Sequence, residues 1–168
     1  MLINEKKTKL LCVSVSKHSV INSYINLQNG EHKKGEETIM MLGFCFGRRP
    51  NVDAHVQYLK RRFYAKVWVI RHFLRSNTPS EDIVKIYCSY VRPVVEYASN
   101  AYHCLLNEEQ SDFIESLQFN ALRMIFGRKY MNSELLAKTD IPRLSDRRVT
   151  ALENFSRKIE KNQRFRDL

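Results

Sequence analysis

Residues 56–75 read VQYLKRRFYAKVWVIRHFLR, and the fold prediction starts from this stretch because its apolar residues recur at helical spacing. The steps are three, four, four, three and four residues, through Val56, Leu59, Phe63, Val67, Ile70 and Leu74. Alternating steps of three and four place side chains on one face of an α-helix. The pattern predicts an amphipathic helix of roughly 22 residues, about 33 Å long.

The same stretch is strongly basic. From Ala54 to Ser80 there is no acidic residue, yet six cationic residues occur there: Lys60, Arg61, Arg62, Lys66, Arg71 and Arg75. Most lie off the apolar positions, so the helix can pack on one side and present charge on another. A field of one sign attracts polyanions, and nucleic acid is the commonest such partner. A solvated face that only aids solubility explains the charge equally well.

Composition limits the class of protein. The chain has 168 residues, 43% of them apolar, with five Gly and four Pro, so disorder is not expected. It carries 28 basic and 18 acidic residues, a net charge of +10. No apolar run approaches membrane-spanning length and the N-terminus lacks a signal-peptide core, so we expect an intracellular protein, nuclear or cytoplasmic. The cysteines form no close pair and the histidines are scattered, so no metal site is expected.

The first fifty residues predict strands. Extended segments are expected at Leu10–Val15, Ile21–Leu27 and Thr38–Phe46, with a tight turn at Asn29-Gly30. Three strands without a covering helix leave edges and a face exposed, which suggests that the chain begins within a larger sheet. We therefore expect a boundary near Pro50, with residues 1–50 strand-rich and residues 51–168 helical.

Further helices are predicted from caps and periodicity. Thr78 would cap a helix with Pro79 at its first position and Glu81 completing a capping box, and Pro93 would kink or interrupt it. A third helix would run from Asn107 to Gly127, a short helical turn would lie within Ser133–Pro142, and Ser145 would cap the last helix. The predicted fold class is α+β: a short antiparallel β-rich N-terminal segment followed by a mainly α-helical bundle.

Five segments, in this order, resemble the reverse transcriptase of non-LTR (LINE-type) retrotransposons from the end of its palm through its thumb. They are LINEKKTK (2–9), ETIMMLGF (37–44), YCSYVRPVVEY (87–97), LQFNALR (117–123) and IPRLSDRR (141–148), and in this order they span almost the whole chain. The last is similar to the family's Pro-x-Leu-x-x-Arg-Arg pattern. The resemblance implies that residues 1–50 are the end of the palm and residues 51–168 a thumb-like bundle.

The resemblance also implies a partner, the RNA/DNA primer–template duplex. Lys7 matches a lysine near the phosphates of the incoming nucleotide, and Lys9 belongs to the same segment, although surface lysines before a strand fit as well. Leu42 and Gly43 match the hairpin that grips the primer, or they form an ordinary hairpin turn. The helix that carries Lys60, Arg61, Arg62, Lys66, Arg71 and Arg75 would lie beside the duplex.

The departures from the family limit the function. The paired aspartates that hold two Mg ions in an intact polymerase are absent, since the chain has no Asp-Asp pair. We therefore assign no catalytic residue, expect no cofactor in this fragment, and expect it to be inactive alone. Its other partners would be the missing fingers and palm or another protein chain. We do not expect it to bind a membrane. The alternatives are a helical protein-interaction module and a transposon-derived relic without enzymatic role; an independent enzyme is the least favoured.

Overall fold

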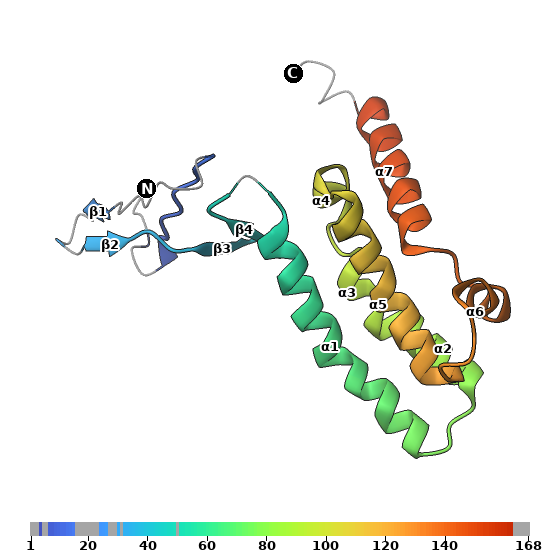
Figure 1. Ribbon diagram of the computed structural model, residues 1–168. Coiled ribbons are helices and arrows are strands. Elements are labelled where there is room, and N and C mark those ends of the chain that lie inside the picture. Colours follow the sequence, from blue (N-terminus) through green and yellow to red (C-terminus); the bar gives the residue numbers. More distant parts are fainter. Residues whose placement is uncertain are drawn as a thin grey trace. The chain divides into compact units, whose positions relative to one another are not determined.

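The computed structural model describes residues 4, 7–15, 24–26, 30, 32–49 and 51–162. The chain divides into two compact units, residues 1–55 and 56–168 (Figure 1). Small antiparallel sheets occupy the first unit and helices make up the second, so the predicted α+β class is confirmed. In the described part of the chain, no helix has the length and apolar character needed to cross a membrane.

Two antiparallel strand pairs form the regular structure of the first unit. Strand β1 (Tyr24–Asn26) pairs with β2 (His32–Lys34), and β3 (Thr38–Met41) pairs with β4 (Phe44–Gly47). The segment Thr38–Phe46, predicted as one extended run, is therefore a hairpin. Its turn residues Leu42 and Gly43 have φ angles of 49° and 78°. Two positive φ angles define the turn type whose twist matches that of paired strands.

The predicted strand Leu10–Val15 is wrong. Leu11 makes a single parallel bridge with Glu36, and no strand forms around it. The backbone bonds of this segment go to separate partners: Glu36 N–H donates to the Leu10 carbonyl over 2.8 Å, and Ser14 N–H donates to the Arg48 carbonyl over 2.9 Å. A continuous ladder with one neighbour therefore never develops. Of the predicted extended segment Ile21–Leu27, residues 21–23 and 27 lie outside the described residues, as does Asn29 of the predicted turn.

The predicted long helix is confirmed as α1 (Asp53–Arg75). Its apolar face is closed off from water, with the side chains of Val56, Leu59, Phe63, Val67 and Ile70 all buried. Asn51 Oδ1 accepts the Asp53 N–H over 3.3 Å at the start of the helix. The apolar stripe read from the sequence is thus the buried face, except at Leu74, which is half-buried.

The second helical region is interrupted before Pro93, as predicted. It consists of α2 (Ser80–Ile86), the π-helical segment η2 (Tyr87–Val91) and α3 (Pro93–Glu96). Arg92 N–H donates to the carbonyl of Tyr87, five residues back, over 2.8 Å. The wider turn accommodates a proline, which has no N–H to give to an α-helical bond.

The predicted cap of this region is wrong. Thr78 does not cap α2, and Pro79 occupies the N-cap position instead of the first helical one. The Thr78 N–H donates to the Phe73 carbonyl over 3.2 Å, in the turn that follows α1. The Pro79 carbonyl accepts the first bonds of α2, from Asp82 and Ile83. Thr78 thus ends one helix and does not start the next.

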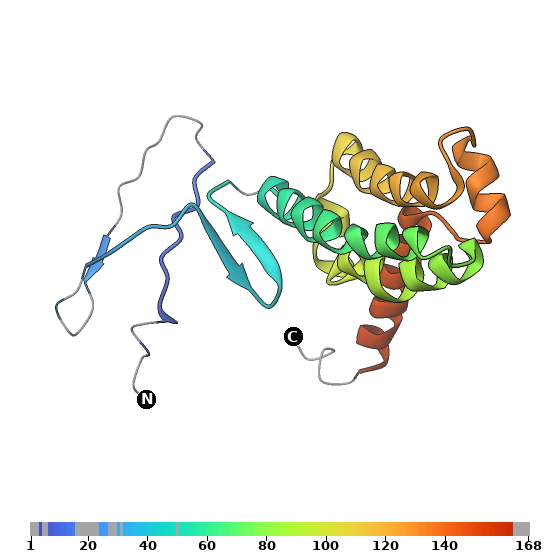
Figure 2. The same cartoon turned by 90° about the horizontal axis from the view of Figure 1, so that it is seen from below.

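The remaining helices are α4 (Ser99–Tyr102), η3 (His103–Leu105), α5 (Glu108–Phe126), α6 (Asn132–Thr139) and α7 (Leu144–Lys161). The start of α5 is as predicted: Asn107 Oδ1 accepts the Gln110 N–H over 2.8 Å, and Gln110 Oε1 accepts the Asn107 N–H over 3.0 Å. Gly127 ends this helix with a φ of 97°. Helix α5 contacts α2 in the core of the second unit, and Figure 2 shows the helices of this unit from below.

Ser145 does not cap the last helix, which corrects another prediction. The carboxylate of Glu115, on α5, accepts the N–H of Leu144 over 3.2 Å and the N–H of Ser145 over 3.0 Å. A carboxylate satisfies the unpaired donors of a helix N-terminus and interacts favourably with its dipole. The cap of α7 therefore also ties α7 to α5.

Candidate nucleic-acid interface

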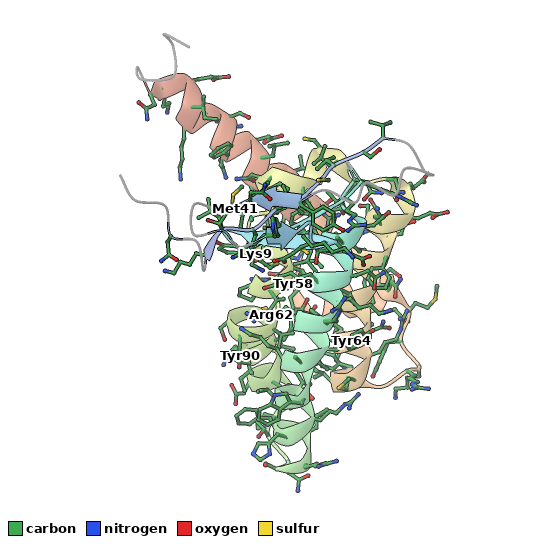
Figure 3. All side chains as sticks on the ribbon, turned by 90° about the vertical axis from the view of Figure 1, so that its left-hand side faces the viewer. Lys9, Met41, Tyr58, Arg62, Tyr64 and Tyr90 are labelled. Carbon is green, nitrogen blue, oxygen red and sulfur yellow. The ribbon has the colours of Figure 1, made fainter. Side chains whose placement is uncertain are left out.

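The six basic residues predicted on α1 fall into two groups, and the first group contacts aromatic rings. Lys66 Nζ lies 4.1 Å from the centre of the Tyr90 ring and donates to the Tyr90 carbonyl over 3.2 Å. Arg62 lies 5.9 Å from the Tyr58 ring centre, and Lys60 Nζ lies 5.5 Å from that of Phe113. Figure 3 looks onto α1 and shows Tyr58, Arg62 and Tyr90 along one edge of it. These cation–π contacts hold the three cations close to the protein surface.

The second group of basic residues is Arg61, Arg71 and Arg75. Together with two aromatic residues they form what we call the outer face of α1. Its members are exposed and are spaced by three, four, three and four positions: Arg61, Tyr64, Trp68, Arg71 and Arg75. At 3.6 residues per turn they occupy a stripe about 80° wide along the helix. Tyr64 lies on the opposite edge of α1 from Tyr58 and Arg62 in Figure 3. Basic and aromatic side chains are therefore interleaved along one exposed stripe.

The three arginines of the outer face are available to an external anion. Within the described residues, the side chains of Arg61, Arg71 and Arg75 make no hydrogen bond or ion pair. The only acidic residue of α1 is Asp53, in its first turn. Guanidinium groups present several donors in a planar fork that matches phosphate oxygens. The outer face is therefore a cationic surface without internal neutralisation.

The other four predicted binding residues lie in the first unit. Lys9 Nζ forms an ion pair with Glu36 Oε2 at 2.9 Å, so its charge is partly neutralised. Lys7 is exposed, and its backbone N–H donates to Asn4 Oδ1 over 3.2 Å. Leu42 and Gly43 form the turn of the β3–β4 hairpin, and the Leu42 side chain is 87% exposed. Of the ten predicted binding residues, four therefore lie in the first unit and six in the second.

Three of the five segments quoted above meet in the second unit. The Glu96 carboxylate accepts hydrogen bonds from Nε and Nη2 of Arg147, the latter over 3.3 Å. Tyr87 Oη donates to Gln118 Oε1, and Gln118 Nε2 donates to the Pro142 carbonyl, both over 3.1 Å. These bonds connect residues 87–97, 117–123 and 141–148. They form a partly buried framework that connects these helices.

Tyr87, a member of this framework, and Arg148, which follows Arg147, are both buried and titratable. Burial raises the pKa of the Tyr87 hydroxyl, so Tyr87 stays protonated and acts as a hydrogen-bond donor. Arg148 is almost fully buried, its Nη2 donates to Ser111 Oγ over 2.8 Å, and burial lowers its pKa. Arg148, unlike Arg61, therefore contributes nothing to the exposed cationic surface.

The described residues contain no group of three or more His, Cys, Asp or Glu placed to hold a metal ion. The adjacent carboxylates have other surroundings: Glu36 pairs with Lys9, Asp82 pairs with Lys85 at 2.9 Å, and Glu108 and Glu109 lie in the first turn of α5.

Sequence reasoning missed the two aromatic members of the outer face, because it gives Tyr64 and Trp68 no role. The signal is nevertheless present in the sequence. Arg61, Tyr64, Trp68, Arg71 and Arg75 follow the same three-and-four spacing as the buried stripe. Comparisons with protein-family models, with curated proteins and with solved structures give no match.

Proposed function

We propose that this chain binds RNA/DNA primer–template duplex through α1, as the palm-end and thumb portion of a non-LTR retrotransposon reverse transcriptase, and that it is non-catalytic alone. The observation that carries the proposal is the outer face, where Arg61, Arg71 and Arg75 are exposed and unneutralised. Phosphate contacts dominate the affinity of proteins for nucleic acid, and arginine is well suited to make them.

The dimensions of the outer face fit a nucleic-acid backbone. Arg61 and Arg75 are 14 positions apart on one helix, a separation of about 21 Å at 1.5 Å per residue. One strand of a duplex advances about 3.4 Å per phosphate, so this distance corresponds to roughly six phosphates. Contacts to phosphate fix orientation and register but carry no sequence information. The proposed role is therefore to hold a duplex, whatever its sequence.

Catalysis by this chain alone is excluded from the proposed role, because the paired aspartates of the family are missing from its sequence. Chemistry would need the fingers and the catalytic part of the palm, which are the proposed protein partners. Extension of a primed RNA template by the isolated chain would contradict this part of the proposal.

The test is fluorescence anisotropy with a labelled RNA–DNA hybrid, titrated at several salt concentrations. The variant Arg61→Gln/Arg71→Gln/Arg75→Gln removes three charges from the outer face. A matched control, Arg128→Gln/Lys158→Gln/Lys161→Gln, removes three exposed charges elsewhere. We expect the outer-face variant to lower the slope of log affinity against log salt by about 0.9 for each phosphate that the arginines no longer neutralise. Equal decreases in both variants would mean that net charge alone attracts the nucleic acid.

A second candidate function, a helical protein-interaction module, is favoured by the exposed apolar side of α7. Val149 and Phe155 are 43% and 47% exposed, and Leu152 lies between them at helical spacing. Apolar side chains exposed together on a helix are typical of a protein contact. The test is size-exclusion chromatography of the parent and of the Phe155→Gln variant over a range of protein concentrations. If both elute as monomers at every concentration, self-association through this surface is contradicted.

A further inference from the structure

We propose that Tyr64 and Trp68 stack on unpaired bases, so that the outer face of α1 binds a single-stranded segment adjoining the duplex. This inference rests on the proposed nucleic-acid binding and names the part of the nucleic acid that contacts the aromatic rings.

The first observation is the exposure of the two rings. Trp68 is 59% exposed and Tyr64 is 43% exposed, on a helix whose opposite face is buried. The Trp68 ring meets the His72 ring at 6.3 Å between centres, and the Tyr64 ring meets that of Phe63 at 5.9 Å, both edge to face. Neither ring is stacked face to face on another ring among the described residues. Both are therefore available to a flat ligand.

The second observation is the charge around the rings. Arg61 precedes Tyr64 on the stripe, and Arg71 and Arg75 follow Trp68, with no acidic residue between Ala54 and Ser80. A protein partner for this stripe would need to be strongly acidic, whereas a nucleic acid supplies both phosphates for the arginines and bases for the rings. A cationic groove or stripe with interleaved aromatic rings is the usual arrangement for binding single strands. Charge complementarity therefore favours a nucleic acid as the ligand of this stripe.

The spacing of the rings favours unpaired over paired nucleotides. Tyr64 and Trp68 are one helical turn apart, about 6 Å along the axis. Consecutive bases in a duplex are stacked about 3.4 Å apart, so two neighbouring paired bases do not match this separation. Bases of a single strand can be unstacked from one another and placed individually on aromatic side chains. The duplex would then contact Arg71 and Arg75 at one end of the stripe, and the adjoining single strand would contact the two rings and Arg61.

Trp68 offers a direct readout, because it is the only tryptophan in the chain. Its emission is followed while the protein is titrated with two hybrids that carry equal numbers of phosphates, one blunt and one with a single-stranded tail. The affinity for each is measured separately by anisotropy of a labelled strand. We expect the tailed hybrid to bind more tightly and to quench the Trp68 emission strongly, while the blunt hybrid binds with little quenching.

Variants separate stacking from apolar bulk. Trp68→Leu keeps an apolar side chain without an aromatic face, and Trp68→Phe keeps the face. Because Trp68 is exposed, both are expected to fold, which circular dichroism checks. Trp68→Leu should weaken binding of the tailed hybrid on the order of tenfold and leave the blunt hybrid unchanged. Trp68→Phe should restore most of the affinity, and Tyr64→Leu should behave like Trp68→Leu.

The outcomes distinguish this inference from the proposed function. One outcome would overturn stacking and leave duplex binding standing. In it, anisotropy shows salt-dependent binding, Trp68 emission does not change, and Trp68→Leu binds the tailed hybrid as tightly as the parent does. If neither hybrid binds, both proposals fail. Equal quenching by the blunt and tailed hybrids would also overturn the preference for unpaired bases.

Discussion

The hydroxyl of Tyr87 donates to Gln118 Oε1 over 3.1 Å, and neither side chain has any exposed surface. Gln118 passes the connection on, because its Nε2 donates to the carbonyl of Pro142. One buried polar chain therefore links η2, α5 and the segment that leads into α7. Buried polar groups are costly unless paired, so each member of this chain depends on the others.

Tyr87→Phe should lower the free energy of unfolding by about 1–3 kcal/mol, because it leaves Gln118 Oε1 buried without its donor. The measurement is urea denaturation followed by circular dichroism. Tyr90→Phe is the matched control, since Tyr90 is exposed and keeps its ring contact with Lys66; it should change the free energy by under about 0.5 kcal/mol. Similar effects from the two substitutions would contradict the importance assigned to the buried bond.

Glu96→Gln should destabilise the second unit by about 1–3 kcal/mol. Glu96 is only partly exposed, it accepts from Arg147, and its Oε1 lies 3.3 Å from Arg92 Nε, so two guanidinium groups share this one carboxylate. The control is Glu153→Gln, which breaks an exposed ion pair with Arg157 of 3.7 Å and should cost under about 1 kcal/mol. Thermal unfolding of the three proteins gives the comparison, and equal melting temperatures for the two variants would refute it.

The first unit should lose stability as the pH falls from about 6.5 to about 4. His55 is fully buried, stacks on Phe44 with ring centres 4.3 Å apart, and accepts the Cys45 N–H at Nδ1. Burial lowers its pKa from 6.5 to about 4. The unfolded chain therefore binds a proton that the folded unit excludes, and the stability present above pH 6.5 falls by up to about 3 kcal/mol at pH 4.

The readout for His55 is hydrogen exchange of the Cys45 amide across this pH range. Exchange rates are first corrected for their intrinsic dependence on pH. The corrected rate should rise as the pH falls in the parent protein, and its pH dependence should flatten in His55→Gln, which has no group titrating there. A parent and a variant with the same pH profile would show that other groups, and not His55, determine the acid response.

Leu42→Asn should stabilise the β3–β4 hairpin by about 0.5–1 kcal/mol. Leu42 has a φ of 49°, a backbone conformation that asparagine adopts more readily than leucine, and its side chain is exposed. Leu42→Ala is the control, because it removes the apolar side chain and keeps the unfavourable backbone conformation. Local exchange of the β3 and β4 amides should slow in Leu42→Asn alone. A gain in Leu42→Ala of the same size would attribute the effect to the exposed side chain and not to the backbone.

Local pattern is sufficient to predict α1, the start and end of α5, and the interruption at Pro93. Periodicity, caps and a missing N–H act within a few residues, and Val56 to Ile70, Asn107 and Gly127 all behave as those rules require. The fold class follows from the change of period after Asn51. The same local rules place the basic residues of α1 correctly on the helix.

Two of the incorrect predictions depend on partners distant in sequence. Ser145 has the composition of a cap for α7, but the carboxylate that caps it belongs to Glu115, thirty residues earlier. Segment Leu10–Val15 has strand composition, yet its backbone bonds at Leu10 and Ser14 join different neighbours. The spacing of Tyr64 and Trp68 is visible in the sequence, and the structure adds that both rings on this edge of α1 are exposed. Composition alone does not contain that information.

The π-helical segment η2 changes the direction in which the side chains that follow it point. In a continuous α-helix, residues nine positions apart, such as Tyr87 and Glu96, would point in opposite directions, since nine residues make about two and a half turns. The π-helical segment absorbs one extra residue, so that Tyr87 reaches Gln118 while Glu96 reaches Arg147. If Tyr87 to Glu96 formed one unbroken α-helix, Glu96 would instead point away from Arg147. The length of this turn is therefore as much a determinant of the fold as the identity of the residues in it.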